Sequence, residues 1–138
     1  MTDITCATVI GHDLDLLKWA VENARERAGI DHKWAVVNWI NPDLIPEAIA
    51  IEKWCSQNDI LYDPFVGITG KGVHGEGTEW FLANLYYCWN RLYEVADTKW
   101  VARMGSDQFF SQGWLEELRS AATEDRAVYH CWTVESTL

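Results

Sequence analysis

The sequence predicts an α/β domain of three layers, in which helices cover both faces of a mostly parallel β-sheet. The first observation is that short apolar runs rich in β-branched residues alternate regularly with segments of helical apolar spacing. The second is length, because 138 residues suit a single domain, residues 1–138, with one core. The third is that no internal repeat or linker divides the chain. We therefore expect βαβ units with right-handed crossovers.

The first strand is expected at Ile4–Ile10, a run of apolar and β-branched residues that stops at Gly11. A helix should follow it, since the apolar residues from Leu14 onward recur at helical spacing. Asp13 is a suitable N-cap for this helix, and Gly29 is suitable just past its end. One strand and one helix thus account for the start of the chain.

The second strand is predicted over residues 32–39, an apolar run that contains two valines and two tryptophans. The NPDLIP stretch that follows indicates a loop, and Pro46 can serve as the first residue of the next helix. That helix is amphipathic and should end near Asn58. A short strand over residues 59–63 is expected before Pro64.

Five glycines lie within residues 64–77, which makes this segment the best candidate for a mobile binding loop. Thr78 can cap the long helix that follows. The core-facing residues of this helix are expected on one broad face: Phe81, Leu85, Cys88, Trp89, Leu92 and Val95. Beyond it, the pattern predicts a strand at Trp100–Met104, a helix over residues 112–123 and a last strand over residues 126–134.

The carboxyl edge of this sheet is the expected place for a ligand. In an open parallel sheet, ligands bind outside the carboxyl ends of the strands. That rule brings four loops together, formed by residues 11–13, 38–43, 63–77 and 105–110. We expect the functional side chains in these loops.

Composition narrows the class of ligand. A formal charge of −10 and a pI near 4.7 argue against nucleic acid or an anionic membrane as the partner, because phosphates would be repelled. An anionic small ligand would need a metal or local donors. No apolar run is long enough to span a bilayer, so no membrane segment is expected. Four scattered cysteines indicate reduced, buried thiols in a cytoplasmic protein: Cys6, Cys55, Cys88 and Cys131.

A lone carboxylate, Asp107, stands in the loop after the strand at Trp100–Met104, behind a glycine and a serine. A hard oxygen ligand at the end of a central strand suits magnesium or manganese, which an acidic protein would need to hold a diphosphate. The alternative is that Asp107 caps a helix over residues 108–118, since Asp is a favoured N-cap. The spacing alone leaves both roles open.

The order of elements and the stretch MGSDQFFSQGWLEEL together resemble the family 2 glycosyltransferases with the GT-A fold. In that family a strand ends in an Asp-x-Asp-like motif, followed by a turn and a helix that often begins with a Pro/Gly-Trp-Leu sequence. The match here is GSD, then QGWLEEL. The resemblance implies binding of a nucleotide-diphosphate sugar, with a divalent metal (Mn or Mg) on the donor diphosphate, and transfer of the sugar to an acceptor hydroxyl.

The same resemblance implies roles for individual residues. Val9, Ile10 and Gly11 would begin the nucleotide pocket, and Asn38 would face the base. Asp107 would bind the metal, with Ser106 beside it in the same pocket. Lys71, in the glycine-rich loop, can meet a donor phosphate as a point charge, although that loop lacks the spacing of a P-loop.

The chain departs from the family pattern in three ways. Gly105 replaces the first acid of the motif, and Asn38 replaces an Asp, so weaker metal binding is expected. The family places its acceptor site and catalytic base after the metal motif, whereas this chain stops soon after Asp107. It therefore looks truncated, like the donor-binding half of a larger enzyme, and its catalytic base is not identifiable.

Two other classes of function remain open. The first is a non-catalytic binding or assembly module that keeps the GT-A fold without its chemistry. The second is another doubly wound nucleotide-binding protein, but no G-x-G-x-x-G follows the first strand, which argues against a dinucleotide. An unpaired edge of a truncated sheet would also favour a homodimer.

Overall fold

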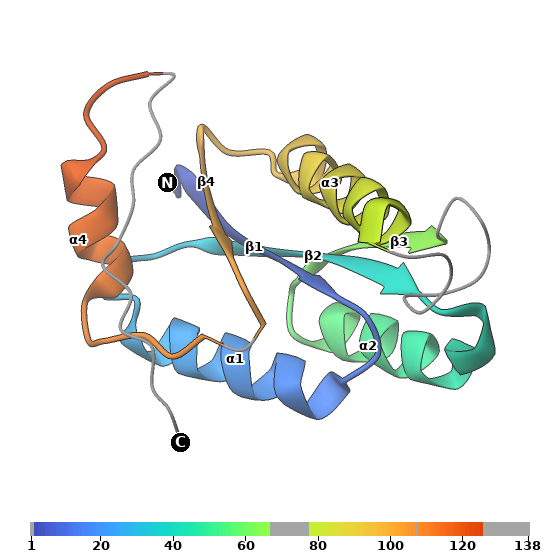
Figure 1. Ribbon diagram of the computed structural model, residues 1–138. Helices are drawn as coiled ribbons and strands as arrows, with labels where there is room; N and C mark the ends of the chain where they lie inside the picture. Colours follow the sequence, from blue (N-terminus) through green and yellow to red (C-terminus); the bar gives the residue numbers. More distant parts are fainter. Residues whose placement is uncertain (1, 67–77, 107, 126–138) are drawn as a thin grey trace.

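The computed structural model describes residues 2–66, 78–106 and 108–125, and the side chains of residues 78–80 lie outside this description (Figure 1). The expected last strand, over residues 126–134, and most of the glycine-rich loop therefore lie outside the described residues. The elements are β1 (Ile4–Ile10), α1 (Leu14–Arg27), β2 (Lys33–Ile40), the 3₁₀ helix η1 (Pro42–Leu44), α2 (Ile45–Gln57), β3 (Leu61–Val66), α3 (Thr78–Val95), β4 (Trp100–Met104) and α4 (Trp114–Ala121).

The described strands form a four-stranded sheet in the order β3-β2-β1-β4, and every pairing is parallel. Ile10 at the end of β1 lies opposite Asn38 of β2, and Thr8 lies opposite Met104 at the end of β4. The parallel sheet predicted from the sequence is confirmed. Because β2 and β4 flank β1 on opposite sides, the chain reverses its direction of progress across the sheet at β1.

The sheet is covered on both faces, as the sequence predicts: α1 and α2 lie below it in Figure 1, and α3 lies above it. Successive residues of β1 face opposite layers, since Cys6 packs toward α1 and α2 while Ala7 packs toward α3. The first layer buries, among others, Leu17, Val21, Trp34, Val36, Ile51 and Leu115. The second buries Ala35, Val37, Trp39, Cys88 and Leu92.

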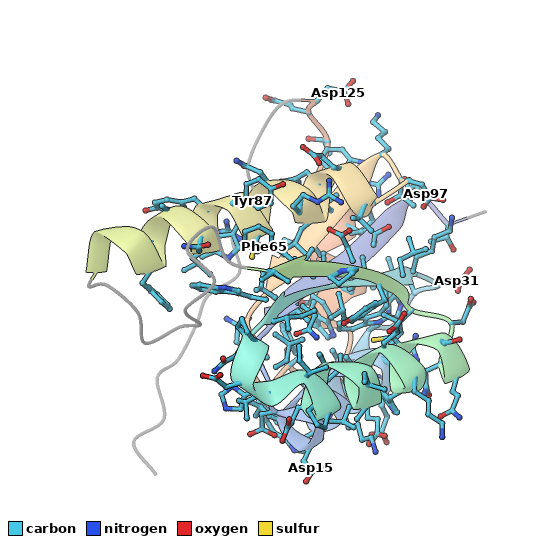
Figure 2. The ribbon with its side chains drawn as sticks, turned by 90° about the vertical axis from the view of Figure 1, so that its right-hand side faces the viewer. Asp15, Asp31, Phe65, Tyr87, Asp97 and Asp125 are labelled. Carbon is cyan, nitrogen blue, oxygen red and sulfur yellow. The ribbon has the colours of Figure 1, made fainter. Side chains whose placement is uncertain are left out.

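Helix α3 uses the broad apolar face that its sequence indicates. Cys88 and Leu92 are buried, and the other four predicted residues pack partly buried against the same core: Phe81, Leu85, Trp89 and Val95. Two further contacts join α3 to β3. Tyr87 stacks on Phe65 with ring centroids 4.4 Å apart (Figure 2), and the guanidinium of Arg91 donates to both carboxylate oxygens of Asp63 at 2.8 and 2.7 Å.

Helix α1 begins and ends where its sequence predicts. The carboxylate of Asp13 accepts a hydrogen bond from the backbone N–H of Leu16 at 2.9 Å, which satisfies one free donor of the first turn. Past the other end, Gly29 has a φ of +82°, a conformation that glycine adopts without steric cost.

Strand β3 is longer than its sequence predicts. It was expected to end before Pro64, but it runs to Val66, and Pro64 pairs in register with Asn38. Proline lacks a backbone N–H and is tolerated on an outer strand, where that group need not pair. Since β3 is the outer strand on this side of the described sheet, the proline does not end it.

Helix α4 is shorter than the predicted range of residues 112–123. It also begins later than residue 108, where a helix capped by Asp107 would have to begin. It spans Trp114–Ala121, and its N-cap is Gly113 with a φ of 77°. Residues 108–113 are not helical. The interpretation of Asp107 as the cap of a helix over residues 108–118 is therefore wrong, because the helix begins well beyond that position.

Candidate functional site

The topological switch between β1 and β4 defines the candidate site. In parallel sheets, ligands bind in the crevice where strand order reverses, and here the order reverses at β1. β1 continues to Ile10, beyond its last pairing with β4 at Thr8 and Met104. The turn that starts at Gly11 and the chain that leaves β4 at Gly105 therefore share the carboxyl edge of the sheet.

The backbone at Gly11 has free space around it. A Cβ atom placed there would meet no heavy atom of the described residues within 4 Å. The neighbouring Ile10 side chain is buried in the core, and Val9 packs against the opposite core. Of the three predicted pocket residues, Gly11 therefore offers open backbone, while the side chains of Val9 and Ile10 serve the two cores.

Asn38 lies buried beneath this turn, with no exposed surface. In the amide orientation that satisfies all its partners, its nitrogen donates to the carbonyl oxygens of Ile10 at 3.0 Å and Gly11 at 2.8 Å. Its oxygen accepts from the hydroxyl of Tyr62 at 2.9 Å. The amide of Asn38 on β2 thus links the carboxyl end of β1 to Tyr62 near the start of β3, and it meets the predicted pocket through the backbone of the turn.

Tyr62 is a residue of this site that sequence reasoning missed. It comes from β3 and is partly buried against the core between the sheet and α1 and α2. Burial raises the pKa of its hydroxyl. The sequence offered one indication of this role, which is the position of Tyr62 on a strand that precedes the predicted binding loop. An aromatic residue on a strand is equally typical of the hydrophobic core.

The chain leaving β4 is held by its own side chains. The backbone N–H of Gly105 donates to the side-chain oxygen of Gln108 at 2.8 Å. Asp107, the predicted metal ligand, lies outside the described residues, whereas its neighbours Ser106 and Gln108 are described and partly buried.

The segment that follows is fastened along α1. The backbone N–H of Phe110 donates to the side-chain oxygen of Asn23 at 3.2 Å, and Arg27 donates to the carbonyl of Phe110 at 3.2 Å. The guanidinium of Arg27 also lies over the ring of Phe109, 4.3 Å from its centroid. These contacts fix the path of the chain from the candidate site to α4.

Four of the predicted site positions can be placed together and two cannot. Gly11, Ile10, Asn38 and Ser106 share the carboxyl edge of the sheet, with Val9 one residue further back on β1. Lys71 and Asp107 lie outside the described residues. Within the described residues, no three His, Cys, Asp or Glu side chains are grouped so as to hold a metal ion.

Comparison with known proteins assigns no family. The chain matches no protein-family model and no curated protein sequence. Of the helices in the described part, none combines the length and apolar character needed to cross a bilayer.

Proposed function

We propose that this chain is the donor-binding domain of a glycosyltransferase-like protein. It binds a nucleotide-diphosphate sugar, with Mn or Mg, at the carboxyl ends of β1 and β4. The observation that supports this most is the switch in strand order at β1, next to an open backbone at Gly11. The GSD and QGWLEEL motifs, which resemble those of family 2 glycosyltransferases, follow β4 at the same edge.

The donor set fits a hard cation that is shared with a substrate. Magnesium is commonly held by one or two carboxylates together with substrate phosphates, and it keeps several waters. Asp107 supplies one carboxylate in the sequence, and the hydroxyl of Ser106 is a second oxygen donor beside it. Asp13 also lies near this edge, but its carboxylate caps α1. The site therefore depends on the diphosphate to complete the coordination.

Charge gives a reason for such a metal. The chain carries a formal charge of −10, so a bare diphosphate would be repelled from most of its surface. A divalent ion would neutralise charge on the diphosphate as it departs. Gly11 would approach the nucleotide with its backbone, and Lys71 would add a point charge from the glycine-rich loop.

Calorimetric titration with UDP and GDP, in manganese and in EDTA, tests this function. We expect binding in manganese and none in EDTA. Asp107→Asn should abolish the binding, whereas Asp31→Asn, the matched control, should retain it. Asp31 lies between α1 and β2 at the opposite edge of the sheet. The control substitution removes the same charge as Asp107→Asn. Equal binding in manganese and EDTA would contradict the proposal.

The second candidate is a non-catalytic assembly module with the same fold. It is favoured by a set of apolar side chains on the outer side of α3, where Leu82, Tyr86 and Tyr93 are 36%, 53% and 51% exposed. Exposed aromatic groups of this kind are enriched at protein interfaces. This candidate predicts no binding of either nucleotide, and self-association that is weakened by Tyr86→Lys in light scattering.

A further inference from the structure

Asn38, Tyr62 and the carbonyl groups of Ile10 and Gly11 form one hydrogen-bonded unit, which we call the Asn38 clasp. The amide nitrogen lies 3.0 and 2.8 Å from the two carbonyl oxygens, and the amide oxygen lies 2.9 Å from the hydroxyl of Tyr62. Asn38 has no exposed surface. Both amide protons and the amide oxygen are therefore used inside the protein.

The geometry demands a neutral donor at position 38. Two carbonyl oxygens converge on one group, so that group must donate twice, which an amide does and a carboxylate does not. A carboxylate there would set negative oxygens against two carbonyl dipoles in a buried place. Glu52 and Asp63 already act on the nearby Tyr62 hydroxyl as negative charges. The two carbonyl oxygens thus explain why an asparagine stands at a position where the family that the chain resembles carries an acid.

We infer that Asn38 and Tyr62 are positioning residues, which hold the turn at Gly11 in the conformation that leaves its backbone open. Recognition would then run through the backbone of Gly11, and the side chain at position 38 would act from beneath it. The ligand part of this inference rests on the proposed function. The structural part does not, because every hydrogen bond of the clasp joins groups of the protein itself.

Restoring an acid tests the demand for a neutral donor. In Asn38→Asp, burial and the two carbonyl oxygens should raise the pKa of the new carboxyl above its ordinary value of about 3.9. Below the ordinary value the new carboxyl is protonated in the folded and the unfolded protein, so it costs no stability. As pH rises from the ordinary value toward the raised pKa, the unfolded chain loses this proton while the folded protein keeps it, and the loss of stability grows. The melting temperature of the variant should therefore fall further below wild type from pH 4 to pH 8.

The matched control is Asn90→Asp, which makes the same change at an exposed position of α3. The melting temperature of Asn90→Asp should lie only slightly below that of wild type, and the difference should not grow with pH. Equal behaviour of the two variants would overturn the inference, since a carboxylate would then be accepted at position 38.

A gentler variant serves if Asn38→Asp does not fold. Tyr62→Phe removes only the hydroxyl that donates to the amide, and Tyr93→Phe is the exposed control. The readout is hydrogen exchange at two backbone amides. The amide of Leu16 reports on the turn, because it donates to the carboxylate of Asp13 at 2.9 Å. The amide of Glu116 is the reference, because it donates to the carbonyl of Ala28 at 3.0 Å, at the other edge of the sheet.

In Tyr62→Phe, exchange at Leu16 should accelerate about fivefold, the loss expected for one hydrogen bond, while exchange at Glu116 stays unchanged. Equal acceleration at both amides, or none at Leu16, would show that the hydroxyl does not position the turn. Affinity for UDP with manganese should fall by a similar factor. If wild type binds no nucleotide, the proposed function fails, and the exchange result still decides the clasp.

Discussion

The indole N–H of Trp114 donates to the backbone carbonyl of Ala24 at 3.0 Å and so joins the first turn of α4 to the last turn of α1. Two backbone bonds reinforce this contact, since Gly113 donates to Arg27 at 2.7 Å and Glu116 donates to Ala28 at 3.0 Å. Donors at the start of one helix thus satisfy acceptors at the end of another. This docking explains why α4 begins at Trp114.

Trp114→Phe should lower the free energy of unfolding by about 1–3 kcal/mol, because it keeps a ring but leaves a buried carbonyl without this donor. Urea denaturation followed by circular dichroism measures the change. Trp54→Phe is the control, since it makes the same reduction in ring size at a partly buried position on α2. A loss no larger than that of the control would contradict a role for the indole hydrogen bond.

Two glycines with positive φ provide a matched pair of substitutions. Gly29 and Gly113 have φ values of +82° and +77°. Among the described residues, a Cβ would collide at Gly29, 2.9 Å from a carboxylate oxygen of Glu116 and 3.2 Å from the Cα of Gly113, but would meet nothing within 4 Å at Gly113. Alanine should cost about 1–2 kcal/mol at either position from backbone conformation. The steric contact should make Gly29→Ala the more destabilising in thermal melts. Equal losses would show that the contact is relieved without cost.

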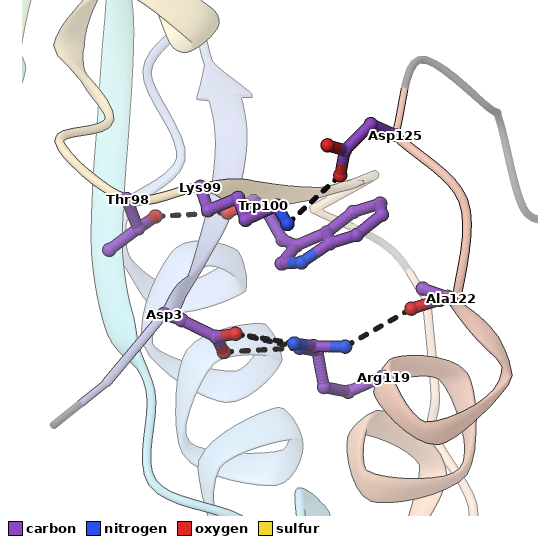
Figure 3. Close-up of polar contacts among 7 residues, drawn as sticks. All are labelled: Asp3, Thr98, Lys99, Trp100, Arg119, Ala122 and Asp125. Carbon is purple, nitrogen blue, oxygen red and sulfur yellow. Dashed lines mark hydrogen bonds and ion pairs between the residues drawn. The ribbon is translucent and has the colours of Figure 1, made fainter.

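The ion pair between Asp3 and Arg119 should make stability depend on pH (Figure 3). The hydrogen bond from Arg119 holds the pKa of Asp3 below its ordinary value. A lowered pKa contributes stability above the unfolded value of about 3.9, and that stability is lost as pH falls through the folded value. Asp3→Asn should therefore melt below wild type at pH 6, and the difference should shrink toward pH 3. Glu22→Gln, at an exposed position of α1, should show no such convergence.

The described cysteines should be unreactive in the native protein. Cys6, Cys55 and Cys88 are free and buried, and burial raises the pKa of Cys55 to about 11 and that of Cys88 to about 12. The thiolate is the reactive form, so Ellman's reagent at pH 8 should find no rapidly reacting thiol in a Cys131→Ser variant. In urea the same three thiols should react. One equivalent of fast reaction without denaturant would refute this picture.

Local patterns in the sequence predicted most of the described fold. The β-branched run at Ile4–Ile10, the Asp13 cap and the stop at Gly29 act within a few residues of themselves, so their sequence carried enough information. The predicted bounds were wrong where residues distant in the sequence determine the end of a strand or the start of a helix. Pro64 fits inside β3 because that strand is an outer one, and α4 begins where α1 offers it acceptors. Neither condition is visible in a short window of residues.

For the candidate site, the sequence predicted the edge of the sheet but not the linkage beneath it. The rule for parallel sheets placed Gly11, Asn38 and Ser106 at one edge. The bond between Asn38 and Tyr62 joins residues that lie 24 positions apart, and no spacing pattern marks such a pair. The roles of Lys71 and Asp107 stay predictions, because both lie outside the described residues.

Paramagnetic broadening by manganese tests most directly whether a metal and a nucleotide diphosphate bind between the ends of β1 and β4. Manganese with UDP should broaden the backbone amide signals of Gly11 and Ser106 and spare those of Gly29 and Asp31 at the opposite edge, while magnesium with UDP should broaden none. Broadening that is strongest elsewhere, or absent at Gly11 and Ser106, would contradict a diphosphate site at this edge.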